Sequence, residues 1–210
     1  MTEFLQALIL GLLIGGVYAL LASGLTLIFG VMNVINIAHG AFLILAAFIT
    51  WSLWRETGLD PLAAIVVLAS LYLMLTRTWL GRAIRASAVN PQGAELVGVK
   101  VASVAALTFA IGVASAGAGG AIASVLYPFL PGSHYQWIAR LLGIIVLGGM
   151  GSLPGAVIGA LCLGVAELMT VTYIGPEWAT GVPYVFVFIV LLLRPQGILG
   201  MRLRQDVATA

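Results

Sequence analysis

Charged side chains are scarce in this sequence, and their longest absence runs from Phe4 to Trp54, which holds no Asp, Glu, Lys or Arg. Charged residues make up 8% of the 210 residues and hydrophobic residues 62%, whereas soluble domains carry about 25% charged residues. A globule of this size has too little interior to hide so much apolar surface from water. A bilayer suits such a chain, because a spanning helix needs about 20 mostly apolar residues.

Several other residue types are too rare to support common kinds of chemistry. The single cysteine, Cys162, excludes an intrachain disulfide. The single lysine, Lys100, stands in no GxxxxGK[ST] loop, which excludes ATP binding by that motif. His39 and His134 have no carboxylate or thiol at metal-ligand spacing, and no serine stands in GxSxG. We therefore expect no catalytic residue, metal or cofactor, and the net charge of +2 gives no reason to expect nucleic acid as a partner.

What the chain has in abundance is apolar segments, which charged and turn residues separate. Seven segments are predicted to lie in the membrane, at 4–30, 36–54, 61–76, 101–127, 137–150, 153–173 and 180–194. The first is read as part of the mature chain, because Met1-Thr2-Glu3 lacks the positive start of a signal peptide. The prediction is an all-α, polytopic transmembrane helical bundle of about seven membrane segments, in one domain spanning 1–210.

Basic residues gather in two polar stretches, the loop 76–103 and the tail 195–210 with the adjoining Arg194. Because Lys and Arg are retained on the cytoplasmic side, both stretches are predicted to be cytoplasmic, with the N-terminus outside and the C-terminus inside. The short pair 137–150 and 153–173 has an alternative as a re-entrant hairpin, which leaves both ends on the same sides.

Glycine is frequent, with 26 residues concentrated in apolar segments, and Gly11 with Gly15 and the series Gly151, Gly155 and Gly159 stand at four-residue spacing. Such spacing places small side chains on one helix face, where another backbone approaches closely, although glycine is common in membrane helices in any case. The glycines between positions 148 and 159, with Pro154 among them, predict a tight or broken helix junction. The residues proposed for packing or breaks are Gly11, Gly15, Gly148, Gly149, Gly151, Pro154, Gly155 and Gly159.

Four polar residues within or between apolar segments are candidates for a translocation pathway, because polar groups at membrane depth are costly unless they serve a purpose. Asn33, Asn36 and His39 are spaced by three and would share one side of a helix. Their alternative role is to satisfy the backbone where the first long segment turns. Glu167 is the sharpest candidate, and its alternative is a structural pair with an arginine such as Arg140.

The loop 76–103 is the other informative stretch. Asn90-Pro91 is expected to break it, and residues 94–97 are predicted to form a short amphipathic helix that ends at Gly98. Such an element can dock a partner, with Arg82, Arg85 and Glu95 at the rim. The alternative is a simple interfacial helix with positive-inside charges.

Four blocks follow one another along the chain: GLLIGGVYALLASGLTLIFGVMNVINIAHGAFLILAAF, TWLGRAIRASAVNPQGAELVGV, VLGGMGSLPGAVIGALCLGVAE and LLLRPQGILG. Together they resemble the permease subunits of bacterial branched-chain amino acid ABC transporters. The resemblance implies a location in the inner membrane, cytoplasmic ATPase subunits, a second homologous permease and a periplasmic amino-acid-binding protein. It also implies that the loop is the element that couples to the ATPase, through Arg82, Arg85, Asn90, Glu95 and Gly98.

The chain departs from the family pattern at one place. The family has a longer region between the counterparts of GLDPLAA and TWLGRAIRA, where this chain has only IVVLASLYLMLTR. The third segment is therefore expected to join the start of one family span to the end of a later one. Losing two crossings leaves the orientation of everything downstream unchanged.

The function expected from the resemblance is that of a permease in an ATP-driven importer for branched-chain or related hydrophobic amino acids, in a family with relatives for urea and short amides. ATP hydrolysis is expected on a separate subunit, so the chain itself is not expected to be an enzyme. The alternatives are a channel or secondary carrier that works without ATP, and a shortened permease that inserts without transporting.

Overall fold

The computed structural model describes residues 2–58, 70, 73–74, 77–194 and 196–200. Every regular element in these residues is a helix, which confirms the all-α prediction. The helices are α1 (Thr2–Met32), α2 (His39–Thr57), α4 (Trp79–Val89), α5 (Pro91–Leu96), α6 (Val101–Leu126), η2 (Pro131–Ser133), α7 (His134–Gly148), α8 (Leu153–Tyr173), α9 (Pro176–Ala179) and α10 (Val182–Leu193). Most of the predicted segment 61–76 lies outside the described residues.

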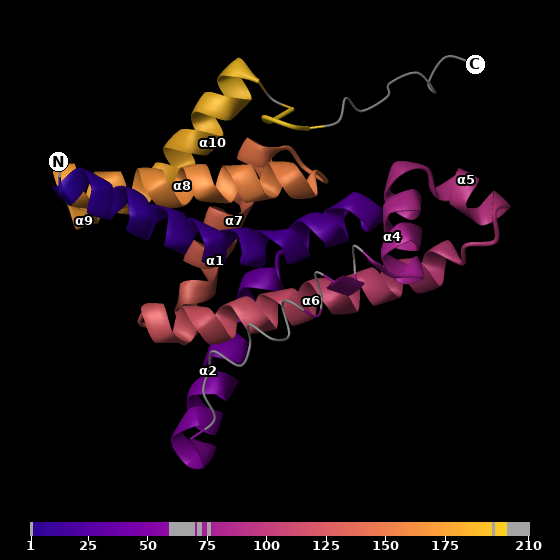
Figure 1. Cartoon of the computed structure of the whole chain (residues 1–210), viewed down its shortest axis with the longest axis horizontal. Coiled ribbons are helices and arrows are strands. Elements are labelled where there is room, and N and C mark those ends of the chain that lie inside the picture. Colours follow the sequence, from indigo (N-terminus) through magenta and orange to yellow (C-terminus); the bar gives the residue numbers. More distant parts are fainter. Residues whose placement is uncertain (1, 59–69, 71–72, 75–76, 195, 201–210) are drawn as a thin grey trace.

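Three long helices form the spine of the molecule. Figure 1 shows α1, α6 and α8 side by side, and α1 packs against both of the others. Among the described residues these 3 helices are long and apolar enough to cross a membrane, while α10 is apolar but shorter. In the same view α2 and α10 extend away from the spine in opposite directions, and α4 and α5 lie at the end far from the N-terminus. The count of seven spans and the orientation of the termini stay predictions.

Glycines allow α1 and α8 to touch along their backbones. A β-carbon on Gly11 would lie 2.7 Å from the Val165 Cα, and one on Gly15 would lie 2.8 Å from the Leu161 Cα. Gly164 faces the same contact from α8, since a β-carbon there would lie 2.6 Å from the Gly11 carbonyl oxygen. The four-residue spacing of Gly11 and Gly15 thus coincides with the face of α1 on which α8 lies.

The junction between α7 and α8 is a tight turn. Gly149 and Gly151 have φ values of 101° and 81°, in the left-handed region where glycine is favoured. The Ser152 hydroxyl accepts a hydrogen bond from the Gly155 N–H at 3.2 Å and caps α8, with Pro154 in the first turn. Of the serial glycines, Gly151 therefore lies in the turn rather than on the helix.

Part of the predicted tail packs against this junction. The N–H groups of Ile198 and Leu199 donate to the carbonyl oxygens of Leu147 and Gly148, each at 2.9 Å. These are carbonyls at the end of α7, which lack partners inside the helix. Residues 196–200 therefore complete the end of α7 instead of extending freely from α10.

Two apolar clusters hold the helices together. The larger joins α1, α2, α7 and α8 around fully buried side chains, which include Tyr18, Leu21, Leu25, Leu43, Leu141, Ile144 and Leu163. The smaller fixes α4 and α5 to the end of α1 and the start of α6, through Val31, Ala83, Ile84, Ala94, Val99 and Val104. The polar loop is thus attached rigidly to two of the three spine helices.

Candidate functional site

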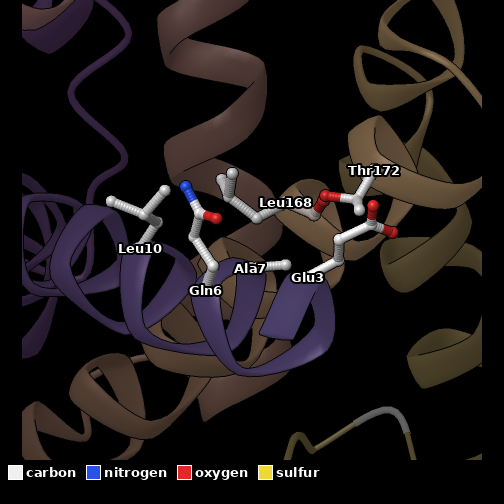
Figure 2. Close-up of a pocket in the computed structure, with 6 residues that line it drawn as sticks. All are labelled: Glu3, Gln6, Ala7, Leu10, Leu168 and Thr172. Atoms are coloured by element: carbon white, nitrogen blue, oxygen red, sulfur yellow. The ribbon is translucent and has the colours of Figure 1, made fainter. Parts of the chain in front are cut away.

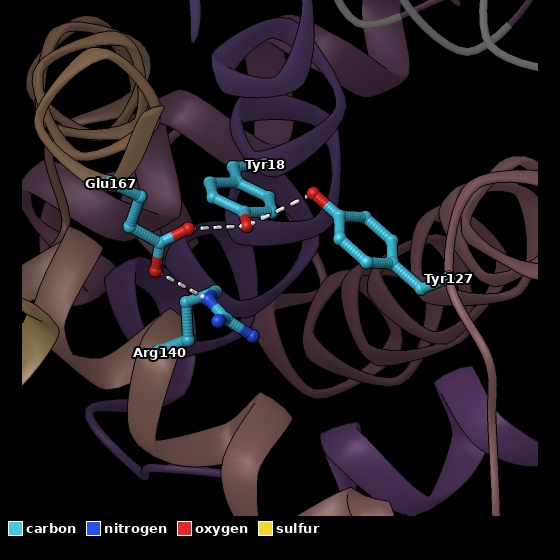
Figure 3. Close-up of polar contacts among 4 residues, drawn as sticks. All are labelled: Tyr18, Tyr127, Arg140 and Glu167. Atoms are coloured by element: carbon cyan, nitrogen blue, oxygen red, sulfur yellow. Dashed lines mark hydrogen bonds and ion pairs between the residues drawn. The ribbon is translucent and has the colours of Figure 1, made fainter. Parts of the chain in front are cut away.

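A charged pair lies inside the helical bundle. Glu167 of α8 is only 4% exposed, and its Oε1 accepts a hydrogen bond from Arg140 Nε of α7 at 2.7 Å. The other carboxylate oxygen, Oε2, accepts a hydrogen bond from the Tyr18 hydroxyl of α1 at 2.6 Å. Figure 3 shows the carboxylate between these two donors.

Two aromatic rings lie beside the Arg140 side chain. The Arg140 guanidinium lies 5.2 Å from the ring centroid of Trp137 and 5.4 Å from that of Tyr18. Both distances fall within the range of a cation–π interaction. The Tyr127 hydroxyl, at the end of α6, lies 3.2 Å from the Tyr18 hydroxyl and extends the network to a fourth helix (Figure 3).

Glu167, Arg140 and Tyr18 form what we call the interhelical clamp, because their contacts join α8 to α7 and α1. The positive and negative charges neutralise each other, and both carboxylate oxygens have donors, which is what a buried ion pair needs to survive in a medium of low dielectric constant. The sequence suggested two roles for Glu167, either in the translocation pathway or in a structural pair with an arginine such as Arg140. The structure contains the pair with Arg140. Sequence reasoning missed Tyr18 and Tyr127, and the only signal for Tyr18 was a hydroxyl within an apolar segment.

The other pathway candidates lie at the break between α1 and α2 and do not form a helical stripe. The chain leaves α1 at Met32, Asn33 has a φ of 53° and residues 33–36 are not helical. Asn33 is exposed and Asn36 half-buried, whereas His39 is 0% exposed. The three residues therefore share no helix face, because the i, i+3 relation holds only within a continuous helix. They lie where the first long segment turns, which is the alternative that the sequence offered.

His39 is nevertheless placed precisely. Its Nε2 lies 3.1 Å from the Leu21 carbonyl oxygen of α1, so the first residue of α2 is tied back to the middle of α1. Its Nδ1 is buried and has no hydrogen-bond partner among the described residues, and the same holds for Asn36 Nδ2. The break between α1 and α2 therefore contains buried polar atoms without hydrogen-bond partners among the described residues.

The described part of the predicted loop, from residue 77 onward, contains two capped helices, α4 and α5. The Asn90 side chain accepts a hydrogen bond from the Gly93 N–H at 2.9 Å, and Pro91 is the first residue of α5. Gly98 has a φ of 85°, and its N–H donates to the Glu95 carbonyl at 2.9 Å, which ends the element. The helix thus begins three residues earlier than predicted, and α4 before it was not predicted.

The outer surface of α4 and α5 combines charge with exposed apolar groups. Arg82, Arg85 and Glu95 are exposed. Leu96 is 89% exposed and Val97 78% exposed. Exposed apolar side chains with charged neighbours are typical of a protein-docking surface.

The described residues contain no group of three or more His, Cys, Asp or Glu residues that could hold a metal ion. Helices of membrane length, a buried ion pair and a polar element at one end of the bundle indicate an integral membrane protein. Comparison with known proteins then identifies the family.

The chain belongs to the family described as "Branched-chain amino acid transport system / permease component", whose sequence profile matches residues 7–67 and 50–192. It is 28% identical to the high-affinity branched-chain amino acid transport system permease protein BraD of Pseudomonas aeruginosa, over 94% of this chain and 96% of the relative. It is 27% identical to the permease protein LivH of Escherichia coli K12 over the same shares. The probable LivH of Methanocaldococcus jannaschii is 28% identical over 65% of this chain and 46% of the relative.

The family comparison also shows the shortening expected from the sequence. The alignment with BraD extends over 299 positions, although this chain has only 210 residues. The family profile matches in two overlapping pieces rather than one, which agrees with an internal deletion. No solved structure matches the chain.

Proposed function

We propose that the chain is the permease subunit of an ATP-driven importer for branched-chain or related hydrophobic amino acids in the bacterial inner membrane. Its partners in this proposal are cytoplasmic ATPase subunits, a second homologous permease that shares the translocation path, and a periplasmic amino-acid-binding protein. The family supports the transport role. The observation that carries the ATP-driven mechanism is the α4–α5 pair, which presents exposed Leu96 and Val97 at one end of the bundle.

The attachment of α4 and α5 explains how motion of an ATPase would reach the membrane helices. Ala83, Ile84 and Ala94 pack with Val31 of α1 and Val104 of α6 in one apolar cluster. A packed cluster transmits displacement as a rigid body, because its side chains have little room to rearrange. Movement of a docked ATPase would therefore tilt α1 and α6 together and shift the bundle between inward-open and outward-open states.

The proposed path runs past the break between α1 and α2. Asn36 Nδ2 and His39 Nδ1 are the buried polar atoms there that lack partners in the described chain, and Asn33 is the exposed polar residue that precedes them. Glu167 enters the proposal as the residue that fixes α7 and α1 on α8, since both of its carboxylate oxygens already have donors.

The orientation proposed for the chain in the membrane can be tested with cysteine labelling. Cys162 is exposed, so it is first replaced by Ala. Gly132→Cys, where an added β-carbon meets nothing within 4 Å, then marks the proposed outer side, and Gln92→Cys in α5 marks the inner side. A membrane-impermeant maleimide is expected to label Gly132→Cys in right-side-out vesicles and Gln92→Cys in inside-out vesicles. The opposite pattern would reverse the proposed topology.

Docking of the ATPase is tested by co-purification after co-expression with the neighbouring transporter genes. The double variant Glu95→Ala, Leu96→Ala is expected to retain about tenfold less ATPase than the native chain, since loss of an interface anchor costs roughly 1–2 kcal/mol. The matched control is Trp178→Ala, which removes an exposed apolar side chain from α9 at the other end of α8. Equal retention by the double variant and the native chain would exclude α5 as the docking element.

The internal deletion favours a second candidate, a shortened permease that assembles without transporting. Reconstitution into liposomes distinguishes the importer, an ATP-independent carrier and the inactive shortened permease. Uptake of leucine that requires ATP and the partner subunits supports the importer, and uptake by the chain alone in liposomes supports an ATP-independent carrier. Normal assembly with no uptake identifies the inactive shortened permease.

A further inference from the structure

A small cavity lies between the first turns of α1 and the last turn of α8. It has a volume of about 220 Å³ and is lined by Glu3, Gln6, Ala7 and Leu10 of α1 and by Leu168 and Thr172 of α8. The α1 residues follow the i, i+3, i+4, i+7 pattern of one helix face. Figure 2 shows the polar ends of Glu3 and Thr172 together at one end of the cavity, Leu10 at the other end and Gln6 between them.

The polar end of this cavity is arranged to receive a cation with N–H groups. Glu3 forms no ion pair within the described part of the chain, where the ion pair is Arg140–Glu167. The Thr172 hydroxyl donates its proton to the Leu168 carbonyl at 2.8 Å, so its oxygen can act toward the cavity only as an acceptor. A carboxylate and a hydroxyl acceptor suit a primary ammonium group, which carries three donors.

The apolar end continues into a second hollow along α1. That hollow measures about 330 Å³ and is lined by Thr2, Leu5, Gln6, Ile9 and Leu10, two of which also line the first cavity. Leu5 is 56% exposed and Ile9 50% exposed. The two hollows together form a groove that passes around α1 from the side that faces α8 and opens on the outer face of α1, where lipid is expected.

The depth of the groove in a bilayer follows from the length of α1. Its 31 residues extend about 46 Å at 1.5 Å each, whereas the hydrocarbon core measures about 30 Å, so the first turn reaches the headgroup level. Leu10 lies about 10 Å further along the helix, at the depth of the acyl chains. Exposed Tyr173 and Trp178 at the same end of the bundle agree with this level, because such residues concentrate at membrane–water interfaces.

We propose that this groove binds a phospholipid with a primary amine headgroup, such as phosphatidylethanolamine. The ammonium group lies on Glu3 and the Thr172 oxygen, the Gln6 amide donates to the phosphate, and one acyl chain passes Ile9 and Leu10 on its way toward the bilayer centre. A choline headgroup has no N–H donor, so phosphatidylcholine forms none of the ammonium hydrogen bonds. The lipid would hold the ends of α1 and α8 together, whether or not the chain transports anything.

The test is native mass spectrometry of the full chain, purified in mild detergent and mixed with equal amounts of phosphatidylethanolamine and phosphatidylcholine of the same acyl composition. The native chain is expected to retain the ethanolamine lipid about tenfold more often, as charge-assisted hydrogen bonds imply. Glu3→Gln is expected to abolish this preference, and Thr172→Val to reduce it. Glu177→Gln, which removes an exposed carboxylate from α9, is the matched control and keeps the preference.

Other outcomes would overturn the proposal. Equal retention of the two lipids by the native chain, or an unchanged preference in Glu3→Gln, excludes recognition of the amine. Displacement of the lipid by excess L-leucine would make the cavity a site for a free amino acid. A second protein chain bound in place of the lipid would make the groove a protein interface.

Discussion

Glu167→Gln is expected to lower the free energy of unfolding by about 3–5 kcal/mol, because it leaves Arg140 as an uncompensated charge inside the bundle. Arginine cannot escape this cost by losing its proton. The carboxylate accepts hydrogen bonds from Arg140 Nε and from the Tyr18 hydroxyl, so its removal weakens contacts among α1, α7 and α8. Thermal unfolding in detergent, followed through the fluorescence of tryptophans such as Trp137 beside the arginine, measures the loss.

Two controls separate the ion pair from a general effect of the substitution. Glu177→Gln changes an exposed carboxylate in α9 and is expected to stay within about 0.5 kcal/mol of the native chain. The double variant Arg140→Met, Glu167→Met is expected to recover most of the lost stability, since apolar groups replace the buried charges. A stable, assembled Glu167→Gln variant that no longer transports would contradict the clamp and return Glu167 to the translocation pathway.

Gly15→Leu is expected to disrupt the contact between α1 and α8 and to cost about 3 kcal/mol, at the upper end of the range for overpacking. A β-carbon at this position would lie 2.8 Å from the Leu161 Cα and 3.0 Å from the Ala160 carbonyl oxygen. These are backbone atoms of α8, which cannot rotate away as a side chain can. The helices must therefore separate, and their buried apolar surface is lost.

The neighbouring glycine provides the control for this experiment. Gly16 is exposed, and an added β-carbon there meets nothing within 4 Å. Gly16→Leu makes the same chemical change one residue along α1 and is expected to leave stability unchanged or slightly raised, because leucine favours the helix more than glycine. The yield of monodisperse protein and its unfolding temperature are measured for both variants. Equal behaviour would show that the four-residue glycine spacing has no packing role.

Local sequence signals located most helices well. The predicted segment 153–173 coincides with α8, which begins after the Ser152 cap and carries Pro154 in its first turn. The segment 101–127 matches α6 to within one residue. In both cases the ends depend on residues adjacent in sequence, so periodicity and caps suffice to find them. The helix α4 was missed because it lies in a stretch read for its charges rather than for its apolar face, where Ala83 and Ile84 are buried.

The sites were harder to predict because their members come from distant parts of the chain. Tyr18 meets Glu167 across 149 positions and Tyr127 across 109 positions, and no periodicity relates residues so far apart. The tail residues Ile198 and Leu199 were likewise placed on the end of α7 by its unpaired carbonyls, a contact without any local signal. The break after Met32 falls between the predicted segments 4–30 and 36–54, and the left-handed Asn33 excludes the helical stripe that the spacing of three would otherwise give.

The sequence by itself determined that this chain is a helical membrane protein, because 62% hydrophobic residues in long uncharged runs have no stable alternative to the bilayer. Its resemblance to the branched-chain permeases rests on residues that are contiguous along the chain, and the comparisons confirm it. Only the tertiary structure decided which polar groups meet. A buried carboxylate such as Glu167 needs a positively charged partner, and the sequence contains several arginines of that charge. Helix packing selects Arg140, whose Nε lies 2.7 Å from Glu167 Oε1.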